Sequence, residues 1–214
     1  KTWSDLCDIP ELPDAGCQAS LLRYTWPDRD GGKSRILYSK GATPDRRVGT
    51  IRVSYDEAKT WPVAKVVCED YFGYSCLTAM SDGTIIMSGT SGVGPPNGFD
   101  LAVWKYNADG TRDNTFGSNG VVQHAIPSYY TMIYAMDVQA DGKILIGGQA
   151  RTTINQNYFF IARLENDVIS AVKELSSVPE AFVYPNPANM YSTISLRISD
   201  AIQSNALIKL YGSD

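Results

Sequence analysis

The sequence has little of what several common function classes need. Its 214 residues include one histidine and four cysteines, and no cysteine pair has the C-x-x-C spacing typical of zinc sites. No apolar run approaches the roughly 20 residues of a membrane-spanning helix. Basic residues number 19 against 23 acidic ones, a net charge of −4, with no basic stripe. These features argue against a zinc protein, a helical membrane protein and a nucleic-acid-binding protein. We expect no metal and no cofactor.

The composition that is present favours an all-β protein. The chain has 13 tyrosines, 18 glycines and 11 prolines, many β-branched residues and no convincing amphipathic helix. Short apolar runs at residues 21–24, 36–39, 50–54 and 64–68 alternate with turn signals and predict strands. The cysteines could form disulfides or stay reduced and partly buried, with reduced thiols favoured; they are Cys7, Cys17, Cys68 and Cys76.

Residues 54–61 read S-Y-D-E-A-K-T-W, which fits the pattern S-x-D-x-G-x-T-W with Ala58 in the usual glycine position. The aspartate of such a turn can accept hydrogen bonds from backbone N–H groups, and the tryptophan can pack into the adjoining core. The pattern resembles the Asp box, which punctuates the blades of sialidase-type propellers. Ala58 predicts a turn that is either strained or of another type. An Asp box marks a fold and carries no activity.

Three segments around this turn extend the resemblance. They are I-P-E-L-P-D-A-G-C-Q-A-S-L-L-R-Y at 9–24, P-D-R-R-V-G-T-I-R-V before the Asp box, and Y-S-C-L-T-A-M-S-D-G-T-I at 74–85. Together they resemble the C-terminal part of bacterial exo-sialidases. The resemblance implies that Arg46 is one of three arginines that hold the sialic acid carboxylate and that Tyr74 is the nucleophile. Arg47 is the fallback for Arg46, because a one-residue slip would exchange them.

The implied chemistry needs these residue types. A planar guanidinium can hold a carboxylate by two parallel hydrogen bonds. That substrate carboxylate would repel a carboxylate nucleophile, so this family uses a tyrosine, an exception among glycosidases. Tyrosine has a pKa of about 10 and needs a neighbouring base, in this family a glutamate. That glutamate, the aspartate acid/base and two further arginines are expected upstream of this chain. The chain begins with K-T-W-S, which resembles the last residues of an earlier Asp box.

The middle of the chain contains a long repeat. The Asp-Gly pairs at 82–83 and 141–142 are 59 residues apart, and the apolar runs at 101–106 and 159–164 are 58 apart. Such a period with Asp-Gly turns is typical of β-propellers. The text Y-N-A-D-G-T, D-N-T-F-G and G-V-V within 106–122 resembles the delta-60 repeat of bacterial secreted and surface proteins, which implies no enzymatic activity. Three aspartates could bind calcium but more simply cap turns: Asp109, Asp113 and Asp141.

The C-terminal part differs in composition. Residues 176–180, S-S-V-P-E, favour a linker, and V-Y-P-N-P-A at 183–188 precedes an alternating strand pattern at 193–198. This start resembles the C-terminal sorting domain of type IX secretion and implies secretion to a bacterial cell surface. A short β-hairpin docked on the propeller is the alternative.

These patterns predict an all-β chain of about three propeller-type blades, an incomplete propeller, plus a short sandwich-like segment. We expect sialidase-like blades at 1–90, delta-60-like repeats at 77–168 and a partial sorting domain at 176–214. The expected function is that of a sialidase-like glycoside hydrolase, or a fragment of one, acting on terminal sialic acid. The alternative is a non-catalytic propeller for surface display, assembly or glycan binding. Expected partners are sialylated glycans and, through open sheet edges, other copies of the chain.

Overall fold

The computed structural model describes residues 8–92, 98–125, 130–151, 157–165, 168–175, 183–184 and 195–196, and they contain strands and turns but no helix. The predicted all-β class is confirmed. Over the same residues, nothing has the length and apolarity of a membrane-crossing helix. The chain divides into two compact units, Lys1–Glu174 and Leu175–Asp214. In the second unit, β12 (Val183–Tyr184) pairs antiparallel with β13 (Ser195–Leu196), and the remaining sorting-domain-like segment lies outside the described residues.

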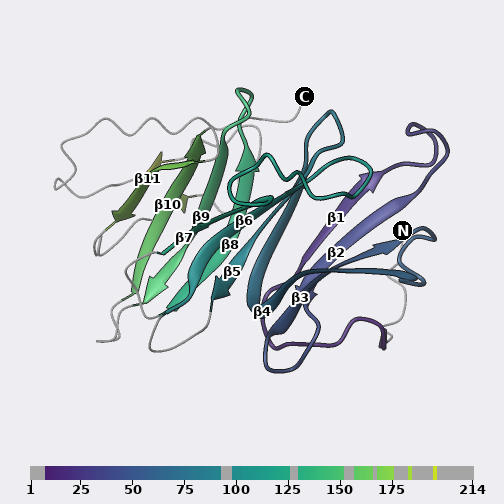
Figure 1. The fold of residues 1–214 in the computed structure, drawn as a ribbon, viewed down its shortest axis with the longest axis horizontal. Helices are drawn as coiled ribbons and strands as arrows, with labels where there is room; N and C mark the ends of the chain where they lie inside the picture. Colours follow the sequence, from purple (N-terminus) through teal and green to yellow (C-terminus); the bar gives the residue numbers. More distant parts are fainter. Residues whose placement is uncertain are drawn as a thin grey trace. The chain divides into compact units, whose positions relative to one another are not determined.

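Two antiparallel sheets make up the first unit (Figure 1). In the larger sheet, seven strands lie in the order in which they occur in the chain: β1 (Ser20–Thr25), β2 (Arg35–Gly41), β3 (Arg47–Ser54), β4 (Val63–Ala79), β5 (Ile85–Gly92), β6 (Asp100–Tyr106) and β7 (Val121–His124). In the smaller sheet the order is β11-β10-β9-β8, with β8 (Tyr130–Val138), β9 (Ile144–Arg151), β10 (Asn157–Glu165) and β11 (Val168–Leu175). The strands expected at 21–24, 36–39, 50–54 and 64–68 are present, and β4 is much longer than the expected 64–68.

Strand β4 is shared by two units of four strands each. Its 17 residues pair with β3 from Val63 to Tyr71 and with β5 from Tyr71 to Ala79. The Ser75 hydroxyl donates to the Ser39 carbonyl at 2.9 Å, so the second half of β4 also contacts β2. We call β1–β4 the first meander, β4–β7 the second and β8–β11 the third. Each has the up-and-down order of a propeller blade.

The meanders pack face to face because the second one is apolar on both faces. Side chains alternate along a strand, so neighbours point to opposite sides. In β6, Trp104 joins a core with Leu37 and Ile51 of the first meander. Its neighbour Val103 joins a second core with Ile146 of the third meander. The second meander therefore packs against the first meander with one face and against the third meander with the other.

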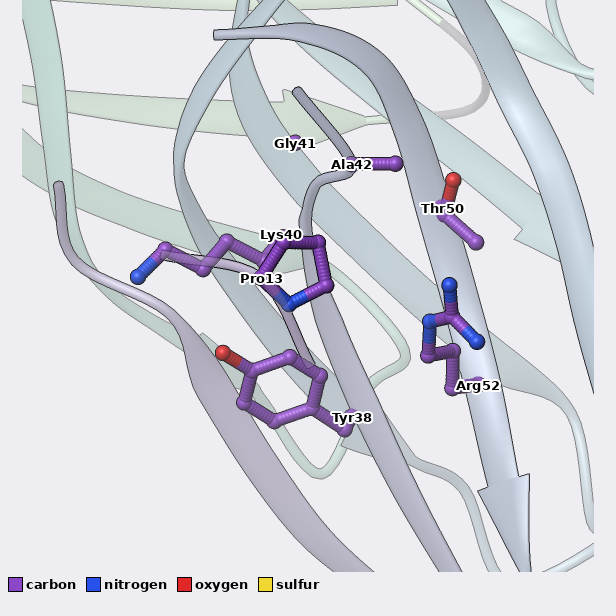
Figure 2. A pocket seen from close by; sticks show the side chains of 7 residues that line it. All are labelled: Pro13, Tyr38, Lys40, Gly41, Ala42, Thr50 and Arg52. Carbon is purple, nitrogen blue, oxygen red and sulfur yellow. The ribbon is translucent and has the colours of Figure 1, made fainter. Parts of the chain in front are cut away.

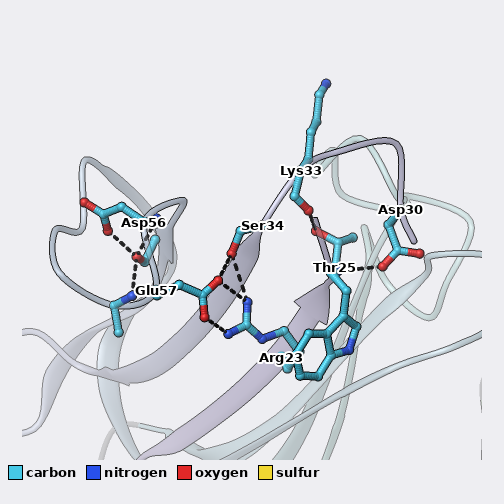
Figure 3. Close-up of polar contacts among 10 residues, drawn as sticks. Arg23, Thr25, Asp30, Lys33, Ser34, Asp56 and Glu57 are labelled. Carbon is cyan, nitrogen blue, oxygen red and sulfur yellow. Dashed lines mark hydrogen bonds and ion pairs between the residues drawn. The ribbon is translucent and has the colours of Figure 1, made fainter. Parts of the chain in front are cut away.

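The Asp-box turn between β3 and β4 is held by its own side chains. The Ser54 hydroxyl donates to the Asp56 carboxylate at 2.9 Å (Figure 3). One carboxylate oxygen of Asp56 accepts the Thr60 backbone N–H at 2.9 Å, and the other accepts the Thr60 hydroxyl at 2.7 Å. Ala58 has a φ of 65°, so of the two expected alternatives, a strained turn or a turn of another type, the structure has the strained one. Trp61 is 4% exposed, and its ring centre lies 5.7 Å from that of Tyr38, so it packs into the core as expected.

Aspartate side chains also cap turns in the second and third meanders. The carboxylates of Asp109, Asp113 and Asp141 each accept the backbone N–H two residues later, at 2.8, 3.1 and 3.2 Å. This is turn capping, the simpler of the two expected roles. Gly142 has a φ of 83°, the conformation that makes glycine useful there.

The described cysteines are free thiols, and Cys7 lies outside the described residues. Burial raises the pKa of Cys76 to about 11, so this thiol stays protonated at neutral pH. For Cys17, Cys68 and Cys76, the reduced alternative is therefore the one present in the structure.

Candidate functional site

The structure places Arg46 and Tyr74 side by side, although 28 residues separate them in sequence. Arg46 immediately precedes β3, and Tyr74 lies in the middle of β4. The two strands are neighbours, with Arg47 opposite Tyr71, and the Phe72 N–H donates to the Arg46 carbonyl at 2.7 Å. Strand pairing of the first meander thus brings the two predicted residues together.

Both residues have a backbone conformation that is rare outside glycine. Arg46 has a φ of 61° and Tyr74 a φ of 50°. Tyr74 also lies where the register of β4 against β5 shifts between Gly73 and Cys76. Such positions cost about 1–3 kcal/mol each and concentrate at functional sites. A bulge of this kind re-aims a side chain, here so that Tyr74 points toward Arg46.

Packing against glycine helps to hold this geometry. Phe72, two residues before Tyr74, is fully buried. A Cβ atom on Gly49 would lie 2.4 Å from Cγ of Phe72, so only glycine permits this approach of β3 to β4. The backbone around Tyr74 is therefore fixed by the core beneath it.

The guanidinium of Arg46 donates only to neutral oxygens. Its Nη1 lies 3.3 Å from the Tyr74 hydroxyl, 3.3 Å from the Tyr71 hydroxyl and 2.6 Å from the Tyr130 hydroxyl. Its remaining contacts are to backbone: Nε donates to the Ala15 carbonyl at 3.2 Å and Nη2 to the Gly16 carbonyl at 2.8 Å. Among the described ion pairs none involves Arg46. The site therefore holds a cation with no paired anion within the described part of the chain.

Aromatic rings form the wall around this cation. The Arg46 Cζ atom lies 5.4 Å from the centre of the Tyr74 ring, close enough for a cation–π contact. Tyr74 meets Tyr130 and Tyr134 edge to face, with ring centres 6.3 and 6.1 Å apart. Phe99 contacts Tyr130 from the other side, at 4.7 Å. Tyr130 and Tyr134 belong to β8, so the third meander completes a site that begins on the first.

The electrostatics keep these hydroxyls protonated. Burial raises the pKa of Tyr74 above its usual value, with the neighbouring Tyr130 adding to the effect and Arg46 opposing it. Burial, together with the hydrogen bond to Tyr71, raises the pKa of Tyr130 to about 12. The hydrogen bond to Tyr71 contributes most to raising the pKa of Arg46, which stays charged. At neutral pH the cluster is one cation surrounded by neutral phenols.

Arg47, the fallback residue, lies outside this cluster. Its side chain is 56% exposed, and its Nε lies 3.4 Å from a carboxylate oxygen of Asp45. The structure thus brings Arg46, and not Arg47, to Tyr74. The roles that the resemblance implies, carboxylate binding by Arg46 and nucleophilic attack by Tyr74, stay predictions.

The sequence patterns did not single out Tyr71, Phe99 or Tyr134. One signal was available. Tyr71 and Tyr130 are 59 residues apart, which is the repeat length itself, and their hydroxyls lie 2.6 Å apart. Equivalent positions of successive repeats can meet in a propeller, so the period could have linked them.

A small hollow lies on the face of β2 and β3 that points away from the second meander. Figure 2 shows its lining, with Tyr38 and Lys40 on β2 and Thr50 and Arg52 on β3. Its volume of about 10 Å³ holds about one water molecule. This hollow is too small for a sugar, so it is not a candidate ligand site.

Comparisons with known proteins match parts of the chain. A family model described as a domain of unknown function (DUF5122), a β-propeller, matches residues 81–116 and 139–167. A sialidase of Micromonospora viridifaciens is 44% identical over 78 residues, which are 35% of this chain and 12% of that protein. This chain therefore spans a small part of the length of that relative. Both findings support a propeller with partial similarity to a sialidase.

A comparison with solved structures gives a weak likeness, from which nothing about fold or function is concluded. The fucose lectin from Kordia zhangzhouensis, solved with methyl-fucoside, has a TM-score of 0.46 and 10% sequence identity, over 75% of this chain and 99% of the lectin. A likeness of this size says nothing about what this chain binds.

Proposed function

We propose that this chain is part of a sialidase-like propeller and holds the carboxylate of a sialic acid with Arg46 and Tyr74. The observation that carries the proposal is the 3.3 Å contact between Arg46 Nη1 and the Tyr74 hydroxyl, at a cation that no described carboxylate pairs. A guanidinium whose partners are neutral keeps its full charge for an incoming anion. The 44% identity to a sialidase supports sialic acid as that anion.

The same geometry favours binding over turnover by this chain alone. In hydrolysis, the Tyr74 oxygen would attack the anomeric carbon as the bond to the leaving sugar breaks, and water would then release the sialic acid. The tyrosine would have to lose its proton to a base. Among the described residues, the Tyr74 hydroxyl contacts Arg46 and Tyr130, and neither accepts a proton at neutral pH. Catalysis by Tyr74 would need an acid and a base supplied from elsewhere.

A fluorogenic sialoside tests the catalytic part. We expect little or no hydrolysis by the isolated chain, and no difference between it and Tyr74→Phe. Robust hydrolysis that Tyr74→Phe abolishes would overturn the proposal that this chain binds without turnover. It would instead establish Tyr74 as the nucleophile of an active enzyme.

Calorimetric titration with N-acetylneuraminic acid tests the binding part. Arg46→Gln removes a charge-assisted contact worth about 1.5–3 kcal/mol, so binding should weaken at least tenfold. Arg47→Gln is the matched control and should bind like the parent chain, because Arg47 lies outside the cluster. N-acetylmannosamine, a related sugar without the carboxylate, should not bind. Equal affinity of the parent chain and Arg46→Gln would contradict the proposal.

The hydroxyl of Tyr130 competes for the same hydrogen atoms of Arg46. It is the closest acceptor of Nη1, at 2.6 Å, and a ligand carboxylate would have to displace it. Tyr130→Phe should therefore strengthen binding of N-acetylneuraminic acid several-fold while leaving the ring contacts in place. Weaker binding would show that this hydroxyl contacts the ligand instead.

Location remains a proposal that rests on resemblance alone. The Y-P-N-P-A start at residues 184–188 supports export to the surface of a bacterial cell, where sialylated glycans would be available. Fractionation of cells that express the tagged full-length protein tests this, and a purely cytoplasmic protein would contradict it.

A further inference from the structure

A cleft opens between the first and second meanders at the end opposite Arg46. Arg46 precedes β3, whereas the cleft is lined by Ile51 and Val53 in the second half of β3 and by Tyr55 just after it. Its volume is about 390 Å³. Pockets for small molecules typically measure roughly 300–1,000 Å³, so this cleft has the size of a ligand site.

The inner wall of the cleft is apolar. Leu37, Ile51 and Ile85 are 3%, 7% and 7% exposed and come from three different strands, and Tyr106 is 2% exposed. Because these residues also belong to the core between the two meanders, the wall is rigid and already formed. An apolar or aromatic body of a ligand would find a dry surface there.

The rim of the cleft carries two cations. Arg35 Cζ lies 6.0 Å from the centre of the Tyr24 ring, and Lys65 Nζ lies 5.6 Å from that of Tyr106. Lys65 also donates to the Gly110 carbonyl at 3.0 Å. Within the described part of the chain, no ion pair involves either residue.

One carboxylate lies among the lining residues, that of Asp109; its hydrogen bonds go to Thr111, and its charge also interacts with that of Lys65. Asp109 accepts the backbone N–H and the hydroxyl of Thr111 at 2.8 and 2.6 Å, and these bonds are the main reason that its pKa is lowered. Asp109 therefore reduces the net charge of the rim to +1, and the rim stays positively charged. The charge pattern suits an anion above an apolar floor.

We propose that this cleft binds a small organic carboxylate with an apolar or aromatic body. The carboxylate lies between Arg35 and Lys65, and the body rests on Leu37, Ile51 and Ile85. Tyr24 and Tyr106 provide ring faces at the two cations. This site is separate from the Arg46 cluster and independent of the proposed sialic acid function.

The probe pair 3-phenylpropionate and 3-phenylpropan-1-ol tests the proposal, because the two differ in charge and share the apolar body. In a titration of the ¹⁵N-labelled chain followed by NMR, the acid should bind saturably and shift the amide signals of Leu37 and Ile85. The alcohol should bind at least tenfold more weakly. Equal binding of both probes, or no saturable binding of the acid, would overturn the proposal.

Single substitutions test whether the acid binds in the cleft or elsewhere on the surface. Arg35→Gln and Lys65→Gln should each weaken binding of the acid by roughly tenfold, since each removes one charge-assisted hydrogen bond. Arg47→Gln should leave it unchanged, because Arg47 lies outside both the cleft and the Arg46 cluster. If both cleft variants bind like the parent chain, the proposal is wrong.

A blocking variant provides a test that does not depend on charge. Val53→Phe adds a ring within the cleft at a half-buried position and should abolish the binding of the acid. The melting temperature of each variant checks that it is folded. Undiminished binding by a folded Val53→Phe protein would also overturn the proposal.

Discussion

The second and third meanders share a sequence period but differ in how much apolar surface is covered. Leu101 and Val103 of β6 are fully buried, because the third meander packs on them. Their equivalents 58 residues later, Phe159 and Ile161 of β10, are 68% and 53% exposed. The repeat specifies two apolar faces for each meander, and a neighbouring sheet decides whether both are buried. The outer face of the third meander is therefore suited to contact another sheet.

Truncating the equivalent residues of the two meanders should have the largest effect on stability. Leu101→Ala should lower the free energy of unfolding by about 2–5 kcal/mol, because it leaves a cavity in a closed core. Phe159→Ala should change it by less than about 0.5 kcal/mol, because the ring already faces solvent. Urea unfolding of the two variants measures both values. Similar losses would mean that the third meander is covered in solution.

Charging the exposed face should reduce self-association. If this face pairs with that of another copy, the double variant Phe159→Lys and Ile161→Lys should weaken association at least tenfold, through repulsion and lost apolar contact. Leu21→Lys is the control, since Leu21 is similarly exposed, at 64%, but lies on β1. Sedimentation velocity over a range of concentrations measures the effect. Unchanged association of the double variant would assign self-association to another surface, such as the sheet edges.

Exchanging glycine and alanine in two turns compares the backbone strain of the Asp-box turn with that of a turn in the third meander. Ala58 in the Asp box and Gly142 in the third meander both have positive φ, 65° and 83°. Ala58→Gly should raise the free energy of unfolding by about 1 kcal/mol by relieving strain, and Gly142→Ala should lower it by about 1 kcal/mol. Nothing lies within 4 Å of a Cβ atom on Gly142, so the effect there is purely conformational. Thermal unfolding should show opposite shifts, and shifts of the same sign would contradict the account.

Lowering the pH should destabilise the Asp-box turn, with a smaller effect on stability than the substitutions above. The hydrogen bonds from Thr60 lower the pKa of Asp56 to about 2. The contact with Arg23, drawn in Figure 3, lowers the pKa of Glu57 to about 2. Both values lie below the usual pKa of about 4. Their stabilisation is therefore present above pH 4 and is lost as the pH falls toward 2. Asp56→Asn should flatten the fall in stability over this interval, and an unchanged pH profile would contradict the assignment.

Much of the fold could be predicted from local sequence. The Asp-box pattern predicted the turn, the bonds to Asp56 and the buried Trp61, because all of these depend on residues within one turn. It left open whether Ala58 would be strained. The 58-residue period predicted the repetition of β6 in β10. The length of β4 was not predicted, because its two halves pair with different partners and no local pattern marks a shared strand.

The candidate site was only partly predictable. Arg46 and Tyr74 were chosen by resemblance, and the structure shows that they are in contact; their roles stay predictions. The bulge at Tyr74 leaves no signal in the alternation of β4. The contacts of Tyr130 and Phe99 join segments far apart in the chain, so they depend on how the meanders pack.

The most direct test of the account is to observe the Arg46 side chain during ligand binding. The chain, labelled with ¹⁵N in its arginines, is titrated with N-acetylneuraminic acid, and the Nε–H signals are followed by NMR. The account predicts a saturable shift of the Arg46 signal while the Arg47 signal stays in place. A titration that leaves the Arg46 signal unmoved, or that moves Arg47 instead, would contradict it.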